Sequence, residues 1–395
     1  MTAALTPRVT EASVRDTVIA WRRQLHQNPE LSFHEERTAQ FVADTLATFG
    51  GLEITRPTPT SVVARLVGAR PGRVLALRAD LDALPIDEQN THDFVSRNPG
   101  VMHACGHDGH TAMLLGAAKI LASRRSELAG ELRFVFQHAE ELNPGGAEEL
   151  VNAGVMDGVD LIVGAHLWLP MPYGQVGVRA GPLMASPDNF RITITGSGGH
   201  AAFPHQTIDP IAIAAQVITN LQHIVSRNVD PLAAAVVSVT RIAGGTTYNV
   251  TPGEVELSGT VRTFDAALRS ELPELMKRIV AGITAAHGAQ FTFEYDRGYR
   301  PVVNDAAATE LIRRAVVAAL GSGALADATP TMGGEDFSAY QARVPGSFFF
   351  IGARNEERGI VQPHHHECFD IDERALDSGT RILVALAMEP AGPGG

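Results

Sequence analysis

Cysteine is scarce in this chain, which contains two cysteines among 395 residues. A scaffold held by disulfides needs more of them, so we expect a chain that folds around its own core in the reducing cytoplasm. Positive charge is also in deficit, because the formal net charge is −12 at pH 7 and the acidic residues are spread along the chain. Polyanion binding needs a basic surface, so we do not expect a nucleic-acid partner.

Long apolar runs are missing as well. No run approaches the length of a membrane span, and Met1–Arg8 lacks the apolar core of a signal peptide, so we expect no membrane association. The remaining composition, 45% hydrophobic and 19% charged, is ordinary for a globular protein. The length is sufficient for two domains.

What the chain does contain is a dense group of metal-type side chains in residues 101–110, which read Val-Met-His-Ala-Cys-Gly-His-Asp-Gly-His. Thiolate, imidazole and carboxylate are the side-chain ligands of divalent transition metals. The two glycines allow a tight loop that turns these groups toward one point. The alternative is a polar loop whose histidines face solvent. Both cysteines, Cys105 and Cys368, lie beside histidines, which favours chemistry over packing.

Short apolar runs predict buried parallel strands of an α/β layer, separated by helical stretches. The first three are residues 74–79, 131–137 and 161–165. Each run is followed at once by polar side chains: Asp80 and Asp82, then Glu140 and Glu141, then His166. Ligands of open α/β sheets bind outside the carboxyl ends of the strands. The pattern therefore predicts a site built from three strand ends.

The pattern changes in the middle of the chain. The predicted order there is strand, helix, strand, strand, helix and strand. In the same order, these elements cover residues 189–195, 210–225, 233–242, 255–263, 268–287 and 290–295. Helix and strand alternate again afterwards, with a helix at 306–320, a strand at 346–352 and a helix at 373–388. We therefore expect an α+β segment, residues 187–298, inserted into an α/β domain made of residues 1–186 and 299–395. Helices are also expected at 14–25, 35–49, 111–123 and 145–153.

Four segments supply candidate metal ligands: Cys105 with His107, Glu140 with Glu141, His166, and the triplet His364–His366. One ion needs three or four ligands, so the surplus predicts two ions about 3.5–4 Å apart that share a bridging ligand. Adjacent glutamates at a strand end are expected to diverge, so that one binds metal while the other acts as a base. Alternatively, the glutamate pair lies on a solvated helix and the histidine triplet in a surface loop.

Motifs in order along the chain resemble the aminoacylase/hippurate hydrolase branch of the metallopeptidase superfamily. That superfamily includes glutamate carboxypeptidase, succinyl-diaminopimelate desuccinylase and the plant auxin-conjugate hydrolases. The motifs are residues 78–85, 102–118, 136–141, 164–168, 198–205, 249–252, 259–264, 332–337 and 364–373. The resemblance extends from about residue 20 to about residue 385. It implies a di-metal α/β catalytic domain with an inserted α+β lid that commonly dimerises.

The resemblance also implies a role for individual residues. The implied metal ligands are Cys105 as a bridging thiolate, His107, Glu141, His166 and His365. Glu140 matches the general base, and Asp82 matches the acid that orients a metal-bound imidazole. His200 matches a lid residue that reaches a neighbouring subunit's active site and steadies the oxyanion. Asn249 and Arg262 match residues that grip the substrate carboxylate. Asp80 stands where more distant relatives place a metal-binding histidine.

The chain departs from the family pattern at two places. His138 stands where relatives more often carry proline or a small residue, which puts an imidazole close to the base. Glu367-Cys368 replaces the common Pro-Arg, so the last ligand could instead be His364 or His366, and Cys368 is either inert or a stray ligand. His103 and His110 are interpreted as groups that stabilise the loop rather than as ligands.

The resemblance implies a cytoplasmic, metal-dependent hydrolase of N-acyl amino acids or hippurate-like conjugates, acting as a homodimer or homotetramer through the lid. Two divalent ions per subunit are expected, from zinc, manganese, cobalt or nickel. A carboxypeptidase or dipeptidase acting on small peptides is the alternative enzyme. An aminopeptidase would need an acidic pocket, and Arg262 argues against it. A catalytically silent protein that binds conjugates or metal would lack the base, yet Glu140 is present.

Overall fold

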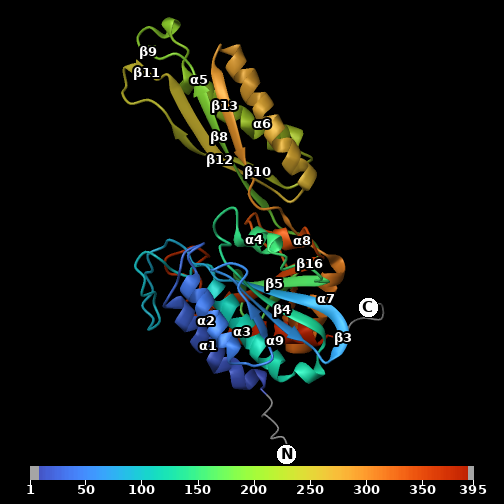
Figure 1. Cartoon of the computed structure of the whole chain (residues 1–395). Coiled ribbons are helices and arrows are strands. Elements are labelled where there is room, and N and C mark those ends of the chain that lie inside the picture. Colours follow the sequence, from blue (N-terminus) through green and yellow to red (C-terminus); the bar gives the residue numbers. More distant parts are fainter. Residues whose placement is uncertain (1–8, 390–395) are drawn as a thin grey trace, which may run out of the picture. The chain divides into compact units, whose positions relative to one another are not determined.

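The structure is a computed structural model that describes residues 9–389, and its elements carry the labels of Figure 1. The chain forms two compact units. The first contains the chain up to Leu183, Val303–Thr329 and the chain from Asp336, and the second contains Met184–Val302 and Pro330–Glu335. The domain boundaries predicted from the sequence stay a prediction. The expected lack of a signal peptide concerns residues 1–8, which lie outside the described residues.

The first unit is built on an eight-stranded sheet with the order β1-β2-β4-β3-β5-β16-β6-β15. Its strands are β1 (Glu53–Thr55), β2 (Val62–Val67), β3 (Arg70–Asp80), β4 (Ala129–Gln137), β5 (Leu161–Pro172), β6 (Val176–Val178), β15 (Leu325–Asp327) and β16 (Gly346–Arg354). The predicted parallel strands are confirmed, because β4, β3, β5 and β16 lie side by side and run parallel. The sheet as a whole is mixed, since β1 and β2 pair antiparallel at one edge and β6 pairs antiparallel with β16.

Helices cover this sheet. They are α1 (Glu11–His26), α2 (Glu36–Ala47), α3 (His107–Ser123), α4 (Gly146–Asn152), α7 (Ala306–Leu320), α8 (Ser338–Gln341) and α9 (Arg374–Met388). Helix α3 packs against both α1 and α9, and α9 packs against α7. Figure 1 shows α1 and α3 on one side of the strands, with α4 and α8 on the other. Buried apolar side chains of strands and helices form one continuous core in this unit.

Helix starts follow local sequence signals. Thr10 begins α1 with a capping box, in which its hydroxyl accepts the Ser13 N–H and the Ser13 hydroxyl accepts the Thr10 N–H. Asp305 caps α7 by accepting the Ala308 N–H. Helix α3 begins at His107, four residues before the predicted start, and this places two histidines of the metal-type loop in its first turn.

The second unit contains a four-stranded antiparallel sheet with the order β10-β12-β8-β13. Its elements are β8 (Ser186–Thr195), β9 (Gly199–His200), α5 (Pro210–His223), a π-helical turn (Ile224–Asn228), β10 (Ala235–Ala243), β11 (Val250–Thr251), β12 (Glu254–Thr263), α6 (Ala266–Ala286) and β13 (Gln290–Asp296). The predicted order of strands and helices is confirmed. The alternation of Phe190, Ile192 and Ile194 along β8 buries all three in a core shared with α5 and α6.

Two short strands, β7 (Gly181–Met184) and β14 (Val302–Asn304), lie where the chain passes from one unit to the next. Among the residues that the structure describes, no helix has the length and apolar character that crossing a membrane requires.

The crossing of α3 with its neighbours requires glycine at position 116. A Cβ atom there would lie 2.6 Å from Val18 Cγ2 of α1 and 3.1 Å from Thr380 Cγ2 of α9. These branched side chains cannot yield easily, so we expect Gly116→Ala to lower the free energy of unfolding by about 1–3 kcal/mol. Gly282→Ala in α6 is the control, because a Cβ atom there meets nothing within 4 Å. The control should stabilise by about 0.5–1 kcal/mol in urea unfolding, and equal effects of both changes would contradict this packing argument.

Candidate metal centre

Three neighbouring strands deliver the polar side chains predicted from the sequence. Asp80 is the last residue of β3, and Gln137, the last residue of β4, precedes the segment that carries the two glutamates. The sequence predicted that His166 follows the end of its strand, but His166 lies inside β5. The strand continues because Leu167 and Trp168 keep pairing with β16 beyond it.

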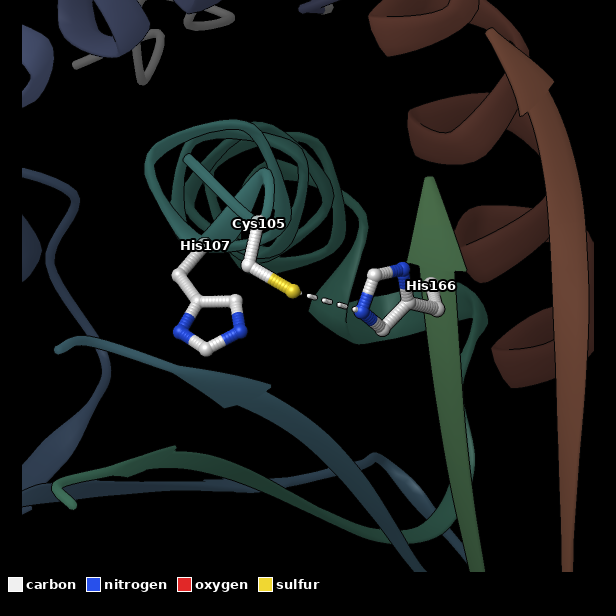
Figure 2. A group of neighbouring side chains, drawn as sticks. All are labelled: Cys105, His107 and His166. Atoms are coloured by element: carbon white, nitrogen blue, oxygen red, sulfur yellow. Dashed lines mark hydrogen bonds between the residues drawn. The ribbon is translucent and has the colours of Figure 1, made fainter. Parts of the chain in front are cut away.

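Cys105 and His107 stand on either side of Gly106 at the start of α3. Gly106 has φ 101°, a left-handed conformation that favours glycine and turns the chain into the helix. The Cys105 Sγ atom lies 3.4 Å from His166 Nε2, so the loop before α3 meets the side chain from β5, as Figure 2 shows. Cys105, His107 and His166 are buried, and their donor atoms lie within 4.8 Å of one another.

Asp82 fixes the orientation of His107. His107 Nδ1 lies 3.0 Å from the Asp82 carbonyl oxygen and 3.2 Å from Asp82 Oδ1. With Nδ1 used as a donor, the lone pair of Nε2 is left free, and Nε2 is buried without a hydrogen-bond partner. A carboxylate behind an imidazole is the usual support of a metal-binding histidine. The geometry therefore fits the role that the resemblance implied for Asp82.

A second group of donors forms around Glu141. Its Oε1 atom lies 3.2 Å from His365 Nε2 without hydrogen-bond geometry, and Cys105, Glu141 and His365 have donor atoms within 4.8 Å of one another. The other histidines of the triplet are engaged elsewhere. His364 Nε2 lies 3.0 Å from the Leu167 carbonyl oxygen, and His366 Nδ1 accepts the Cys368 N–H. The geometry thus favours His365 as the last ligand, and this assignment stays a prediction.

Cys105 belongs to both groups, which is the arrangement expected of a ligand that bridges two ions. One group adds the imidazoles of His107 and His166 to the Cys105 sulfur. The other adds the Glu141 carboxylate and the His365 imidazole. Thiolate and imidazole suit zinc and its neighbours among the divalent transition metals, and the carboxylate adds a hard ligand. The residues present therefore fit a dinuclear site.

Electrostatics in this region call for a cation. Burial lowers the pKa of His107, but the carboxylates of Asp80, Asp82 and Glu141 outweigh burial and raise it to about 10. Burial, followed by the negative charges of Glu141 and Glu140, raises the pKa of the Cys105 thiol well above its usual value. Burial lowers the pKa of His166, so this imidazole is neutral. A divalent ion would offset the repulsion between these negative charges and would favour the thiolate form of Cys105.

The two adjacent glutamates do not diverge as expected. Ligand atoms of His107, Glu140 and Glu141 lie within 4.8 Å of one another, so both carboxylates face the same space. The reason lies in the backbone, because Ala139 has φ 50° and breaks the alternation of the preceding strand. Glu140 is 7% exposed and lies beside the donors without belonging to the two groups that share Cys105. This position suits a base.

Asp80 is held by neighbouring side chains, and one oxygen of its carboxylate lies within 4.8 Å of ligand atoms of His107 and His110. Its Oδ2 atom accepts from Arg78 Nη1 at 2.6 Å, and its Oδ1 atom lies 2.7 Å from His110 Nδ1. His110 Nε2 accepts the Leu167 N–H at 2.8 Å. Both nitrogens of His110 are therefore used to hold β5 beside α3, in agreement with the expectation that it stabilises the loop.

Sequence reasoning missed a network behind the two glutamates. Asp336 accepts from Arg78 Nη2 at 2.9 Å, from Gln137 Nε2 at 2.7 Å and from the Ala147 N–H at 3.0 Å. Ser32 Oγ donates to Asp82 Oδ2 at 2.7 Å. The signal was present in Arg78, since an arginine within an apolar strand is almost never buried without a carboxylate partner.

Glu35 was also missed. Its Oε1 atom accepts the Ala139 N–H at 2.8 Å, directly before Glu140, while its Oε2 atom is buried without a hydrogen-bond partner. Burial, and then the negative charge of Asp82, raises the pKa of Glu35 to about 8. A neutral carboxylic acid therefore supports the segment that carries the proposed base.

The departures from the family pattern have structural partners. His138 is buried, and its Nε2 atom lies 2.9 Å from Glu149 Oε2 at the start of α4. Its ring contacts that of Phe33, with 5.7 Å between ring centroids. Cys368 is half-buried and appears in none of the donor groups described above.

His200, Asn249 and Arg262 all belong to the second unit. His200 and Asn249 are brought together by the β9–β11 pair, in which the Ala201 N–H donates to the Asn249 carbonyl oxygen at 3.0 Å. Both side chains are exposed. Arg262 lies on β12, where its guanidinium donates to the Asp188 and Val261 carbonyl oxygens. Their roles toward a substrate stay predictions.

Comparison with known proteins places the chain among metallopeptidases. Residues 76–389 match the family described as peptidase family M20/M25/M40. An N-acyl-L-amino acid amidohydrolase of Geobacillus stearothermophilus is 66% identical over 74% of this chain and 79% of the relative. Thermostable carboxypeptidase 2 of Saccharolobus solfataricus is 40% identical over 95% of this chain and 96% of its own length.

A solved structure shares the fold. The YXEP protein of Bacillus subtilis, described as a dinuclear metal binding peptidase from the M20 family, superposes with a TM-score of 0.84. It is 40% identical and covers 95% of this chain and 98% of its own. The resemblance inferred from the motifs and the predicted α/β fold class are thereby confirmed.

The raised pKa of Glu35 predicts how stability depends on pH. The folded chain keeps this proton up to about pH 8, whereas an unfolded glutamate releases it near the ordinary value of 4.5. Between these values the folded state binds the extra proton, so this group makes stability fall as pH rises. Glu35→Gln keeps an acceptor for the Ala139 N–H but cannot ionise.

We therefore expect urea midpoints of Glu35→Gln to improve relative to the unchanged chain as the pH rises from about 5 to about 8, at constant metal concentration. Glu36→Gln, at the exposed neighbouring position, is the control and should follow the unchanged chain. Parallel curves for Glu35→Gln and the unchanged chain would show that Glu35 is ionised in the fold.

Proposed function

We propose that this chain, which belongs to peptidase family M20/M25/M40 and is a metal-dependent amidohydrolase, cleaves the amide bond of N-acyl amino acids. The observation that carries the proposal is the pair of donor groups sharing Cys105, placed next to the carboxylate of Glu140. The substrate class is supported by the name of the relative that is 66% identical.

The proposed ligands of two divalent ions are Cys105, His107, Glu141, His166 and His365. Buried His107 Nε2 and Glu141 Oε1 lack hydrogen-bond partners, which is the condition expected of atoms kept for a metal. Zinc, manganese, cobalt and nickel all suit this donor set. When bound, the ions would lower the pKa of a water molecule and polarise the amide carbonyl.

The chain's own groups then move the proton. Glu140 takes a proton from the attacking water and returns it to the nitrogen of the leaving amino acid. Asp82 keeps His107 in the tautomer whose Nε2 lone pair faces the site. His200 donates a hydrogen bond where negative charge develops on the former carbonyl oxygen. Asn249 and Arg262 bind the free carboxylate of the substrate.

A carboxypeptidase acting on small peptides is the second candidate, favoured by the relative named thermostable carboxypeptidase 2. Both reactions leave an amino acid with a free carboxylate, so they share the base and the metal ligands. Rates on a panel of N-acetyl, N-benzoyl and N-aminoacyl derivatives of one amino acid, with each metal added in turn, separate the two.

Two free cysteines support the reducing cytoplasm as the proposed compartment.

The base and the ligand can be separated by substitution. We expect Glu140→Gln to keep both metal ions and to lower kcat by about 10²–10⁴. Glu141→Gln should instead lower the metal content, because it removes a donor. Metal analysis and steady-state kinetics on an N-acyl amino acid measure both effects. The reverse result, an empty site in Glu140→Gln and a full one in Glu141→Gln, would exchange the two assignments.

We also propose that the chain acts as a homodimer or homotetramer in which His200 serves the active site of a neighbouring subunit. His200→Ala should then keep its metals and lose most of its kcat, since the lost contact acts in the transition state. Mixing His200→Ala with Glu140→Gln subunits should restore activity, because a hybrid dimer assembles one intact site. Each variant alone is the control. Isolated heterodimers without recovered activity would mean that His200 does not act across subunits.

A further inference from the structure

A second cluster of metal-type side chains lies in the first unit and contributes none of the ligands proposed above. His26 is the last residue of α1, and Glu88 and His92 lie in the connection of residues 81–106 that joins β3 to α3. One donor atom from each of these three residues lies within 4.8 Å of the other two. The cluster joins the end of a helix to the chain that leads into Cys105.

The donor atoms have the spacing that a small divalent ion requires. His26 Nε2 lies 3.1 Å from Glu88 Oε1, and His92 Nε2 lies 3.4 Å from the same oxygen. Zinc bonds to nitrogen and oxygen of roughly 2.0–2.1 Å in a tetrahedron place neighbouring donors about 3.4 Å apart. The observed separations are therefore close to those of a formed site.

Asp108 orients His26 from behind. Asp108 Oδ2 lies 2.8 Å from His26 Nδ1, and Arg22 Nε donates to the same oxygen at 2.9 Å. With Nδ1 of His26 on this side, its Nε2 atom faces Glu88. A carboxylate, an imidazole and a metal in line are a common arrangement in metal sites.

Hydrogen bonds from a protonated His26 to Asp108 and Glu88 would account for the close contacts of these three residues. They do not account for the position of His92. The His92 ring is stacked on Phe94, with 3.7 Å between centroids and 13° between planes, and neither of its nitrogens makes a hydrogen bond although both are buried. Leaving buried polar atoms without a partner is unfavourable.

Unpartnered atoms are concentrated here. Five of the ten buried side-chain nitrogen and oxygen atoms without a hydrogen-bond partner in the described part of the chain belong to His92, His103 and Asp108. His103 is 2% exposed, and its ring centroid lies 6.3 Å from that of His26. A cation held by His26, Glu88 and His92 would supply a partner for one of these atoms, a nitrogen of His92.

We propose that His26, Glu88 and His92 bind a third divalent cation of the zinc class, in addition to the dinuclear centre. Two imidazoles and one carboxylate form a set that zinc prefers, with a fourth position left for water. The ion fastens the 81–106 connection, which contains no helix or strand, to the end of α1. The connection carries Cys105, so fastening it holds one side of the dinuclear centre in place.

Zinc binding to the full chain tests the proposal. Metal is removed with a chelator, zinc is added in excess and exchanged by dialysis, and bound metal is counted by mass spectrometry. We expect about three zinc ions per unchanged chain and about two in His92→Phe, which keeps a ring to stack on Phe94 but offers no donor. His34→Gln removes an exposed imidazole and should keep three. The same zinc content in the unchanged chain and in His92→Phe would overturn the proposal.

Cobalt(II) separates this site from the dinuclear centre. The third site has no sulfur ligand, so His92→Phe should release one cobalt and leave the thiolate-to-cobalt absorption band unchanged. A weaker band in His92→Phe would place the lost ion at Cys105 and contradict the proposal. An absent band in the unchanged chain would count against the dinuclear centre and not against the third site.

Proteolysis tests the role of the ion. Arg97 is exposed within the connection and offers trypsin a cleavage position. Zinc should slow cleavage after Arg97 in the unchanged chain and in His34→Gln, but not in His92→Phe, because only the first two retain the full donor set. Protection by zinc in all three chains would mean that the ion does not fasten the connection through His92.

Discussion

The candidate centre depends on one buried carboxylate, that of Asp82. It accepts hydrogen bonds from Ser32 Oγ and from the Glu141 N–H, and it lies against His107 Nδ1. Three segments far apart in the sequence thus meet at one side chain, which is 1% exposed. Burial raises the pKa of Asp82, but its hydrogen bonds outweigh burial and hold it below its usual value, so the acceptor stays ionised. Without it, each segment would have to satisfy a buried donor elsewhere.

The positions of the ligands are obtained at the expense of backbone strain. All three non-glycine residues with positive φ in the described part of the chain, Phe33, Ala139 and His365, lie in segments that form or support the centre. Conformations of this kind cost about 1–3 kcal/mol each and persist where the surroundings determine them. The surroundings here are the buried sheet and the helices packed on it, which tolerate little displacement.

Charge inside the sheet is balanced by a network rather than by pairs. Arg78 contacts Asp80 on its own strand, Gln137 on the neighbouring strand and Asp336 from a distant segment. Removing one partner of such a network leaves an uncompensated buried charge, which is more costly than losing an exposed pair. The network therefore couples the ends of β3 and β4, which are followed by Asp82 and by the proposed base Glu140 with its neighbour Glu141.

The sequence by itself determined the fold class, the strands that carry the candidate site and the chemical types of the candidate ligands. Apolar runs followed by acids, and a loop dense in cysteine and histidine, are local signals that need no tertiary contact to be read. The tertiary structure decided what depends on direction in space: that His365 rather than His364 faces Glu141, that both glutamates face the same space, and that His166 lies inside its strand. It also supplied Ser32, Glu35 and the partners of His26, because hydrogen bonds between segments far apart along the chain leave no periodic trace in the sequence.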